Sequence, residues 1–266
     1  MKIHNTYLFG KVLDKTAWTP AELEKIGLRA QAARELMRGA SREYIVNTLV
    51  KAGKLFEKGG KYRKAALAHL KEHITFSEPV IDKSLDVIPE LLNKQAMNKR
   101  MSMELFLPYA LETTIERRGY EGLIRAMPKG VVLHVGAGNV FLGILDSLVI
   151  GFLTKNVNIV KLSSSGSNFI NLFMDALKEV DEEGILAKSA AIISWKGGSQ
   201  GLEEAALKNV NAVFVWGGYE AVQSYRKIAP IDVRVEGFGP KTSVGLVFES
   251  CVLNEGMDAV AQRAAT

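Results

Sequence analysis

The chain has 266 residues, of which 47% are hydrophobic and 24% are charged, and its formal net charge at pH 7 is +5. This length allows a sizeable core, and the composition excludes a disordered or fibrous protein. The single cysteine, Cys251, excludes an internal disulfide and a cysteine-rich metal site. Because no segment has the long uncharged run of a membrane helix and the N-terminus lacks a signal-peptide pattern, we expect a cytoplasmic protein without a membrane span.

The excess of basic residues lies in the first part of the chain. Residues 1–128 contain 22 Lys and Arg against 15 Asp and Glu, whereas residues 129–266 contain 12 against 14. A basic surface attracts polyanions such as nucleic acid, an acidic carrier protein or the phosphates of coenzyme A. Charged runs on helices usually face only water, however, so we expect a solvated helical surface and no nucleic-acid binding.

The first part of the chain is expected to be mainly helical. The segment Thr19-Pro20-Ala21-Glu22 combines an N-cap, a first-turn proline and a capping-box acid, and the helix that begins there should end at Gly39. A second helix is expected from Ser41 to the glycine pair Gly59-Gly60, and a third from Tyr62 to His73.

Two prolines, Pro79 and Pro89, are expected to mark further breaks. A last helical stretch is predicted from Leu111 to about Met127, ahead of the turn Pro128-Lys129-Gly130. We therefore expect a first region, residues 1–128, that is mainly helical and serves acyl or partner binding, or oligomerisation.

From Gly130 onward, short apolar runs alternate with amphipathic segments, which predicts βαβ units and a parallel sheet. The segments Phe141 to Leu153 and Asn168 to Val180 are long enough to be crossover helices. The expected strands are VVLHV (131–135), NIVKL (158–162), SAAIISW (189–195), NAVFVW (211–216) and SVGLVF (243–248). The predicted fold is α/β, with a helical N-terminal region followed by a Rossmann-like parallel sheet over residues 129–266.

In an open parallel sheet, ligands bind beyond the carboxyl ends of the strands. The first predicted strand is followed by Gly136-Ala137-Gly138-Asn139. Its glycines would allow a ligand to approach the backbone closely, and the Asn139 amide could face a developing oxyanion. Phe141 occupies the position of the third glycine of a GxGxxG fingerprint, so a plain strand-to-helix turn is the alternative.

The second predicted strand carries Lys161 near its end and is followed by Ser163-Ser164-Ser165-Gly166-Ser167. A lysine in an apolar strand is costly to bury unpaired, so it should reach an anion at the sheet edge, where hydroxyls and free amides form a phosphate cradle. The alternative is that Ser167 only caps a helix and Lys161 reaches water. No acidic residue lies here to bind a ribose 2′-hydroxyl, which favours NADPH over NADH.

Two later strand ends also carry glycines, in Lys196-Gly197-Gly198-Ser199 and in Gly217-Gly218-Tyr219. Small residues at four consecutive strand ends suggest a nucleotide lying along the edge. The following run Val235-Glu236-Gly237-Phe238-Gly239 places a carboxylate among glycines, where Glu236 could act as a general base near a thioester. A tight turn with an exposed Glu236 is the alternative.

The segment His69-Leu70-Lys71-Glu72-His73 satisfies the zinc pattern H-x-x-E-H. The chain has only four histidines and offers no obvious third ligand, so we expect no metal site. His134, inside a predicted strand, is expected to be a core or edge residue rather than a base.

A family resemblance rests on residues 128–165, PKGVVLHVGAGNVFLGILDSLVIGFLTKNVNIVKLSSS, and on the runs WGGYEAV and VEGFGPK. These segments resemble the LuxC-type acyl-CoA reductases, and more distantly the aldehyde dehydrogenases. The resemblance implies an aldehyde dehydrogenase type of sheet that binds NADPH. It also implies roles for individual residues: oxyanion stabilisation by Asn139, ribose and 2′-phosphate binding by Lys161, Ser163 and Ser164, pyrophosphate and nicotinamide binding by Gly217 and Gly218, and catalysis by Glu236.

This family reduces a long-chain acyl-CoA, or another acyl thioester, to the aldehyde through a cysteine acyl-enzyme. By the resemblance, the nucleophilic cysteine follows the helix that begins near Asn254, so we expect it beyond residue 266 and expect the chain to stop before the catalytic domain. Cys251 is then structural. Expected partners are an acyl carrier, an acyl-protein synthetase and further copies of the chain. The alternative is a non-catalytic nucleotide-binding or partner-binding module.

Overall fold

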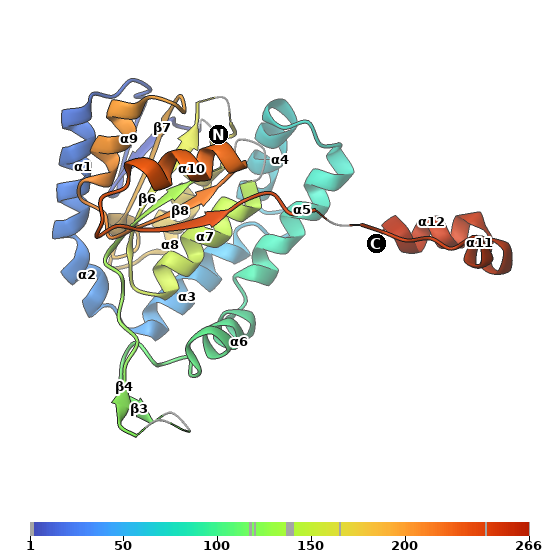
Figure 1. Cartoon of the computed structure of the whole chain (residues 1–266), viewed down its shortest axis with the longest axis horizontal. Coiled ribbons are helices and arrows are strands. Elements are labelled where there is room, and N and C mark those ends of the chain that lie inside the picture. Colours follow the sequence, from blue (N-terminus) through green and yellow to red (C-terminus); the bar gives the residue numbers. More distant parts are fainter. Residues whose placement is uncertain are drawn as a thin grey trace.

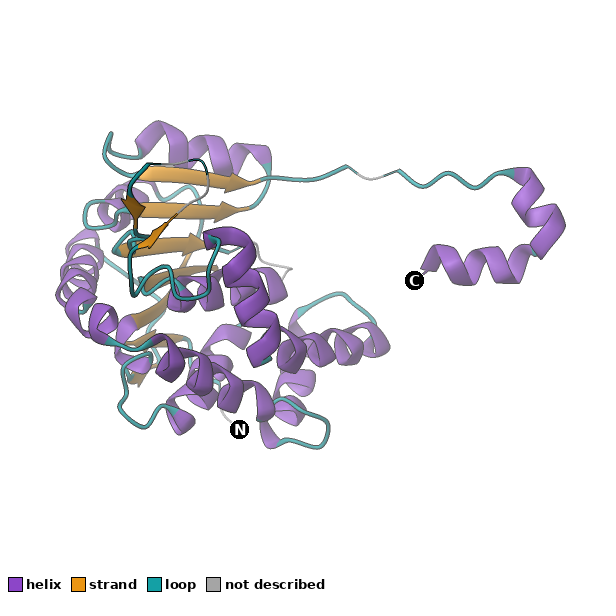
Figure 2. Ribbon diagram, turned by 90° about the horizontal axis from the view of Figure 1, so that it is seen from below, coloured by secondary structure: helices purple, strands orange, loops and turns teal. Residues whose placement is uncertain are grey.

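The computed structural model describes residues 3–116, 119, 121–136, 141–164, 166–242 and 244–265. A twisted central sheet is surrounded by helices, and an arm that carries the last two helices extends from the body (Figures 1 and 2). None of the described helices is both long enough and apolar enough to cross a membrane.

Seven strands form the central sheet, in the order β2-β1-β7-β6-β5-β8-β9. The five strands from β5 to β9 are parallel, and β1 lies antiparallel on β7. The chain order reverses between β5 and β8, which is the position where open α/β sheets form a ligand-binding crevice. The strands are β1 (Thr6–Leu8), β2 (Lys11–Leu13), β5 (Val131–Val135), β6 (Val157–Ser163), β7 (Ala190–Trp195), β8 (Ala212–Trp216) and β9 (Arg234–Phe238).

The helices form a layer on each face of the sheet, because right-handed crossovers that run in opposite directions from β5 place their helices on opposite faces. Helices α7 and α8 pack together, with α3 outside them, whereas α10 packs on α9 and α1 also packs on α9. The helices that follow the first parallel strand are α7 (Phe141–Leu153), α8 (Phe169–Val180), η1 (Ala187–Ser189), α9 (Gln200–Leu207), α10 (Tyr219–Ile228), α11 (Glu249–Glu255) and α12 (Met257–Ala265).

The expected helices of the first part are largely present. Thr19 and Glu22 form the predicted capping box, in which the Thr19 side chain accepts from the Glu22 amide and the Glu22 carboxylate accepts from the Thr19 amide. The Ser41 side chain caps α3 by accepting from the Tyr44 amide. The helices are α1 (Pro20–Ala32), α2 (Arg34–Gly39), α3 (Arg42–Lys54), α4 (Lys61–His73), α5 (Glu78–Leu91) and α6 (Lys94–Leu105).

The break expected at Pro89 is wrong, because this proline lies inside α5, which ends two residues later at Leu91. This proline removes its own hydrogen bond to the carbonyl four residues before it, and the helix continues past it for only two residues. Pro79 lies in the first turn of α5. The backbone amide that a proline lacks would have no partner within the helix at this position.

The helix expected from Leu111 to Met127 is also wrong. This segment contains the antiparallel pair β3 (Ile115–Glu116) and β4 (Leu123–Ile124). Gly119 and Gly122 between these strands have φ values of +78° and +127°, a backbone conformation that no α-helix contains. The hairpin extends away from the sheet (Figure 1).

The last strand of the sheet differs from the expected one. Residues 244–248 have no regular secondary structure, and the fifth parallel strand is β9, in the run around Glu236 for which a tight turn was the alternative. Gly237 is required there because a Cβ atom would lie 2.4 Å from Cγ1 of Val222 on α10. The glycine therefore reflects close packing of a helix on a strand, not a turn.

The first part of the chain also contributes two strands that the sequence did not indicate, β1 and β2, at one edge of the sheet. Tyr7 on β1 is fully buried, and its hydroxyl donates to the carbonyl of Ala187 at 3.0 Å. Buried residues from both parts of the chain belong to one hydrophobic core. The division at residue 128 stays a prediction about domains.

A buried polar network ties β5 to α7 and β6. His134 is fully buried; its Nδ1 lies 2.7 Å from Ser147 Oγ and its Nε2 lies 3.0 Å from Asn158 Oδ1. Asn158 Nδ2 donates to the carbonyl of Asn156, so its oxygen faces the ring and accepts from Nε2–H. The Ser147 hydroxyl then donates to Nδ1, and His134 is a neutral imidazole in the core.

Acidification is expected to destabilise the protein through His134. Burial lowers the pKa of His134 to about 4, whereas the same group in the unfolded chain titrates near its ordinary value of about 6.5. The contribution of neutral His134 to the free energy of unfolding is therefore fully present above about pH 6.5. It is lost as the pH falls toward 4, and the difference is about 3 kcal/mol. Urea unfolding at pH 7.5 and 4.5 measures the loss, which His134→Gln should reduce; His69, whose pKa is also lowered to about 4, contributes to the remainder. An imidazolium NMR signal for His134 at pH 6 would contradict this assignment.

Candidate functional site

The predicted site residues lie mainly at the carboxyl end of the parallel sheet. Adjacent parallel strands end at one edge, and the backbone bonds from the Gly136 amide to the Lys161 carbonyl and from the Gly217 amide to the Phe238 carbonyl hold neighbouring ends together. Ser163 ends β6, and Ser164 follows it. Gly198 follows β7, and Gly218 is the N-cap residue of α10. Three predicted residues, Ala137, Gly138 and Asn139, lie outside the described residues.

Lys161 is a buried cation at this edge. Its side chain extends from β6, the residue is 5% exposed, and its Nζ lies 5.4 Å from the centre of the Trp195 ring. Within the described part of the chain, no carboxylate lies within ion-pair distance of Nζ. Burial lowers the pKa of Lys161, and the charge of Glu203 opposes this effect. An ammonium in this position is costly to bury without an anion.

Glu203 is a buried carboxylate near Lys161, and no local sequence pattern indicates its role. It belongs to the first turn of α9, it is 4% exposed, and its Oε1 accepts from the Gly198 amide at 3.0 Å. Gly198 has a φ of +83°, and a Cβ atom on Gly197 would lie 4.0 Å from Lys161 Nζ. The loop that follows β7 thus lies beside the lysine and is held there by Glu203.

Two buried donors lack a hydrogen-bond acceptor among the described residues: Trp195 Nε1, whose ring lies beside Lys161, and the Tyr225 hydroxyl, which feels the charge of Glu203. Burial raises the pKa of Tyr225, and the charge of Glu203 raises it further. Because buried polar groups are normally hydrogen-bonded, unpartnered donors of this kind indicate a place where a ligand or ordered water completes the structure.

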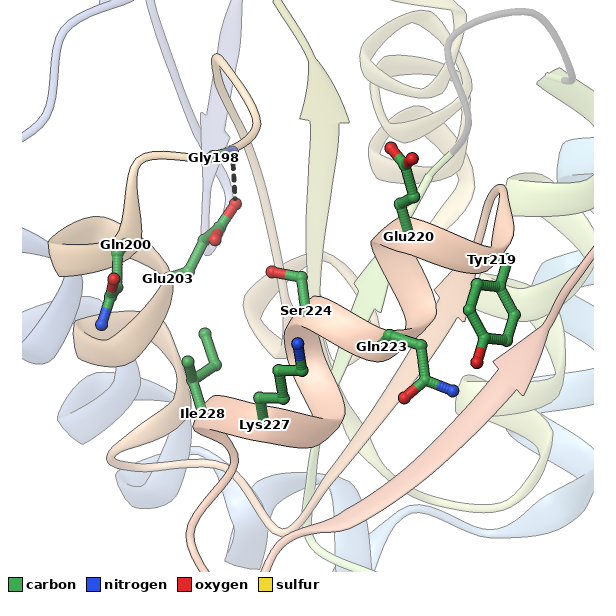
Figure 3. Close-up of a pocket in the computed structure, with 9 residues that line it drawn as sticks. All are labelled: Gly198, Gln200, Glu203, Tyr219, Glu220, Gln223, Ser224, Lys227 and Ile228. Atoms are coloured by element: carbon green, nitrogen blue, oxygen red, sulfur yellow. Dashed lines mark hydrogen bonds between the residues drawn. The ribbon is translucent and has the colours of Figure 1, made fainter.

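A groove of about 560 Å³ lies between α9 and α10. Figure 3 shows Glu203 projecting from α9 with its bond to Gly198, and Ser224 and Lys227 coming from α10. The groove is lined by Gly198, Gln200, Glu203, Tyr219, Glu220, Gln223, Ser224, Lys227 and Ile228. Most of its lining residues carry polar side chains, and Gly198 and Tyr219 place one part of it just beyond strands β7 and β8, which suits a ligand of nucleotide size.

Glu236 lies on the opposite face of the sheet. It is on β9 rather than in a turn, and Arg234 Nε donates to its carboxylate at 2.5 Å. Successive strand residues face opposite sides; since Gly237 faces Val222 on α10, Glu236 faces the side of α7. The stacked rings of Trp216 and Phe238, 4.3 Å apart, lie on that side too. The predicted site residues therefore lie on both faces of the central sheet, at the carboxyl end of its parallel strands.

The histidine pair of the zinc pattern has another role. His69 Nε2 accepts from the Asn168 amide at 3.1 Å, and the rings of His69 and His73 are stacked at 4.0 Å. Burial lowers the pKa of His69 to about 4, with a smaller contribution from His73. The described residues contain no group of three or more His, Cys, Asp or Glu side chains that could hold a metal ion.

Cys251 lies on α11, in the arm that extends from the body (Figure 2), and it is partly buried and not in a disulfide. It is therefore remote from the strand ends that carry Lys161 and Gly217.

Comparison with known proteins shows strong similarity to one family. The sequence profile of the acyl-CoA reductase (LuxC) family matches residues 39–266. The long-chain acyl-protein thioester reductase of Aliivibrio fischeri is 29% identical over 207 residues, which are 76% of this chain and 43% of that protein. The corresponding protein of Photorhabdus luminescens is 28% identical over 220 residues, which are 81% of this chain and 44% of that protein. The chain spans less than half the length of these relatives.

Solved structures of aldehyde dehydrogenases share the fold. Betaine aldehyde dehydrogenase from Staphylococcus aureus, in complex with NAD+, has a TM-score of 0.71 at 14% identity and covers 90% of this chain and 50% of its own. An aldehyde dehydrogenase from Bartonella henselae has a TM-score of 0.70 at 14% identity and covers 96% and 58%. The expected aldehyde dehydrogenase type of α/β fold is confirmed.

Proposed function

The chain belongs to the acyl-CoA reductase (LuxC) family, and we propose that it forms the cofactor-binding part of a reductase that uses NADPH to convert a long-chain acyl thioester to the aldehyde. The observation that carries this proposal is the buried ammonium of Lys161, which has no carboxylate partner among the described residues and lies beside a groove of nucleotide size. A phosphate group would supply the missing counter-charge.

The described residues fit NADPH. Lys161 with Ser163 and Ser164 would hold the adenosine ribose and its 2′-phosphate, and the groove between α9 and α10 would receive the adenosine end. Gly217 and Gly218 would let the pyrophosphate approach the backbone at the end of β8. The bound cofactor supplies the hydride of the reduction.

The division of the site between two faces supports an extended ligand that crosses the sheet edge. Lys161 and the groove lie on the side of α9 and α10, whereas Glu236 faces the side of α7. A dinucleotide that crosses between β5 and β8 would place its two ends on different faces, with the nicotinamide near Glu236. The roles of Glu236 as a general base and of Asn139 in oxyanion stabilisation belong to this proposal.

The proposed substrate is a long-chain acyl group carried by coenzyme A or by a protein, and the name of the relatives, acyl-protein thioester reductase, favours a protein carrier. An acyl-protein synthetase partner, a homo-oligomer and the cytoplasmic location remain parts of the proposal. The second candidate function is a nucleotide-binding or partner-binding module without catalysis, which would bind the cofactor equally well.

Titration with NADPH tests the cofactor proposal. We expect saturable quenching of tryptophan fluorescence with energy transfer to the reduced nicotinamide, because Trp195 and Trp216 end strands β7 and β8 at the proposed site. We expect 2′,5′-ADP to displace NADPH. Absence of saturable binding up to millimolar NADPH would refute the proposal.

Cys251→Ala provides the matched control, because Cys251 lies on the arm, away from the strand ends. The variant should bind NADPH as the wild-type chain does. After incubation with myristoyl-CoA, mass spectrometry should find no acyl group on Cys251. An adduct that disappears in the variant would make Cys251 a nucleophile and would contradict its expected structural role.

A further inference from the structure

Glu203 has acceptor capacity that the protein leaves unused. The carboxylate forms one described hydrogen bond, from the Gly198 amide at 3.0 Å, and no described cation lies within ion-pair distance of it. An ionised carboxylate offers about four acceptor positions. Glu203 is 4% exposed and lines the groove between α9 and α10, so its remaining positions are open to a ligand in that groove rather than to bulk water.

Glu203 lines the groove, and Lys161 lies beside the Gly197-Gly198 loop that borders it, so opposite charges lie on either side of this loop. They do not form an ion pair, yet Glu203 is the group whose charge opposes the effect of burial on the pKa of Lys161, so the two interact through space. Gly197 and Gly198 lie beside both, since a Cβ on Gly197 would lie 4.0 Å from Lys161 Nζ and the Gly198 amide binds Glu203.

Opposite charges act differently on the two kinds of ribose that a dinucleotide can carry. The ammonium attracts a ribose phosphate, which the carboxylate repels through the same poorly solvated space. A ribose without the phosphate presents hydroxyl groups, which donate hydrogen bonds to a carboxylate, as they do in dinucleotide-binding folds. The segment directly after β6, residues 164–167, contains no acid, but the fold brings one from α9.

We propose that Glu203 is a specificity-determining residue, which weakens the binding of 2′-phosphorylated ligands and strengthens the binding of ligands with a free ribose 2′-hydroxyl. Lys161 and Glu203 together then set the ratio between NADPH and NADH at this site. This inference rests on the proposed function, since it requires that the adenosine end of the cofactor occupies the groove.

The isosteric variant Glu203→Gln tests it. Glutamine keeps an oxygen that accepts from the Gly198 amide and removes only the charge. Isothermal titration with 2′,5′-ADP and with 5′-AMP reports the adenosine end alone. We expect 2′,5′-ADP to bind roughly tenfold more tightly to the variant, the scale of one like charge several ångströms away at an effective dielectric constant of about 20. We expect 5′-AMP to bind several-fold more weakly.

Glu204→Gln is the matched control, because Glu204 follows Glu203 on α9 but is exposed and does not line the groove, so water screens its charge. It should leave both affinities within about twofold. Glu203→Asp, which retains the charge, should keep the wild-type ratio of the two affinities. Circular dichroism verifies that each variant is folded.

Opposite shifts of the two ligands support the inference, because a purely structural effect would move both affinities in one direction. Two shifts of the same sign, or no shift, in a folded Glu203→Gln variant would overturn it while leaving the proposed function intact. If the wild-type chain binds neither ligand and no NADPH, the proposed function fails and this inference fails with it.

Discussion

Replacing Lys161 with methionine is expected to weaken NADPH binding by roughly 10- to 100-fold, the scale of a lost charge-assisted hydrogen bond to a phosphate, and at the same time to stabilise the fold. Burial lowers the pKa of Lys161, so the folded chain holds the proton less tightly than the unfolded chain and the lysine opposes folding at neutral pH. Methionine fills a similar volume without a charge, and we expect a gain of about 1–2 kcal/mol. Fluorescence titration and urea unfolding measure the two effects.

Lys196→Met is the control for Lys161→Met, since Lys196 follows Trp195 directly but is exposed. The Lys196→Met variant should have nearly the same free energy of unfolding and nearly the same NADPH affinity as the wild type. A Lys161→Met protein that is less stable than the wild type and binds NADPH unchanged would make Lys161 a structural residue. The opposite signs of the two expected effects are typical of a residue that is retained for binding rather than for folding.

The parallel sheet could be predicted where a strand is an uninterrupted apolar run. Val131–Val135 is buried at every position and coincides with the predicted strand, because a strand covered on both faces needs no polar alternation. The strand Arg234–Phe238 was missed because its glycines are not typical of a strand and left a tight turn open, and the need for Gly237 becomes visible only when α10 is in place. The pair β1 and β2 has three-residue strands, which are too short for a periodic pattern.

The part of the candidate site that lies at the carboxyl ends of the strands could be predicted from the sequence. Parallel strands bring Gly136, Lys161 and Gly217 to one edge whatever the helices do. Glu203 and Tyr225 were missed because their positions depend on how α9 and α10 pack, which no local pattern reports. An acid in the first turn of a helix also has an ordinary role near the helix dipole, so Glu203 carries no distinctive sequence signal.

Gly151→Ala is expected to destabilise the protein by about 3 kcal/mol, the largest stability effect that we predict for a single methyl group. A Cβ on Gly151 in α7 would lie 1.9 Å from Asn158 Oδ1 and 3.2 Å from His134 Nε2. Asn158 must move, so a buried histidine loses its acceptor and the core is overpacked, each at a cost of about 1–3 kcal/mol. The better helix propensity of alanine returns only about 1 kcal/mol. Urea unfolding at pH 7.5 measures the net change.

Two further variants separate the clash from a general effect of adding a methyl group. Gly39→Ala, at a glycine with nothing within 4 Å of its Cβ position, should stay within about 0.5 kcal/mol of the wild type. Asn158→Ala removes the side chain that the new methyl group would meet, so Gly151→Ala should be much less harmful in that background than in the wild type. If the two substitutions change the free energy of unfolding additively, the clash with Asn158 is not the reason for Gly151, and the glycine is needed for another reason.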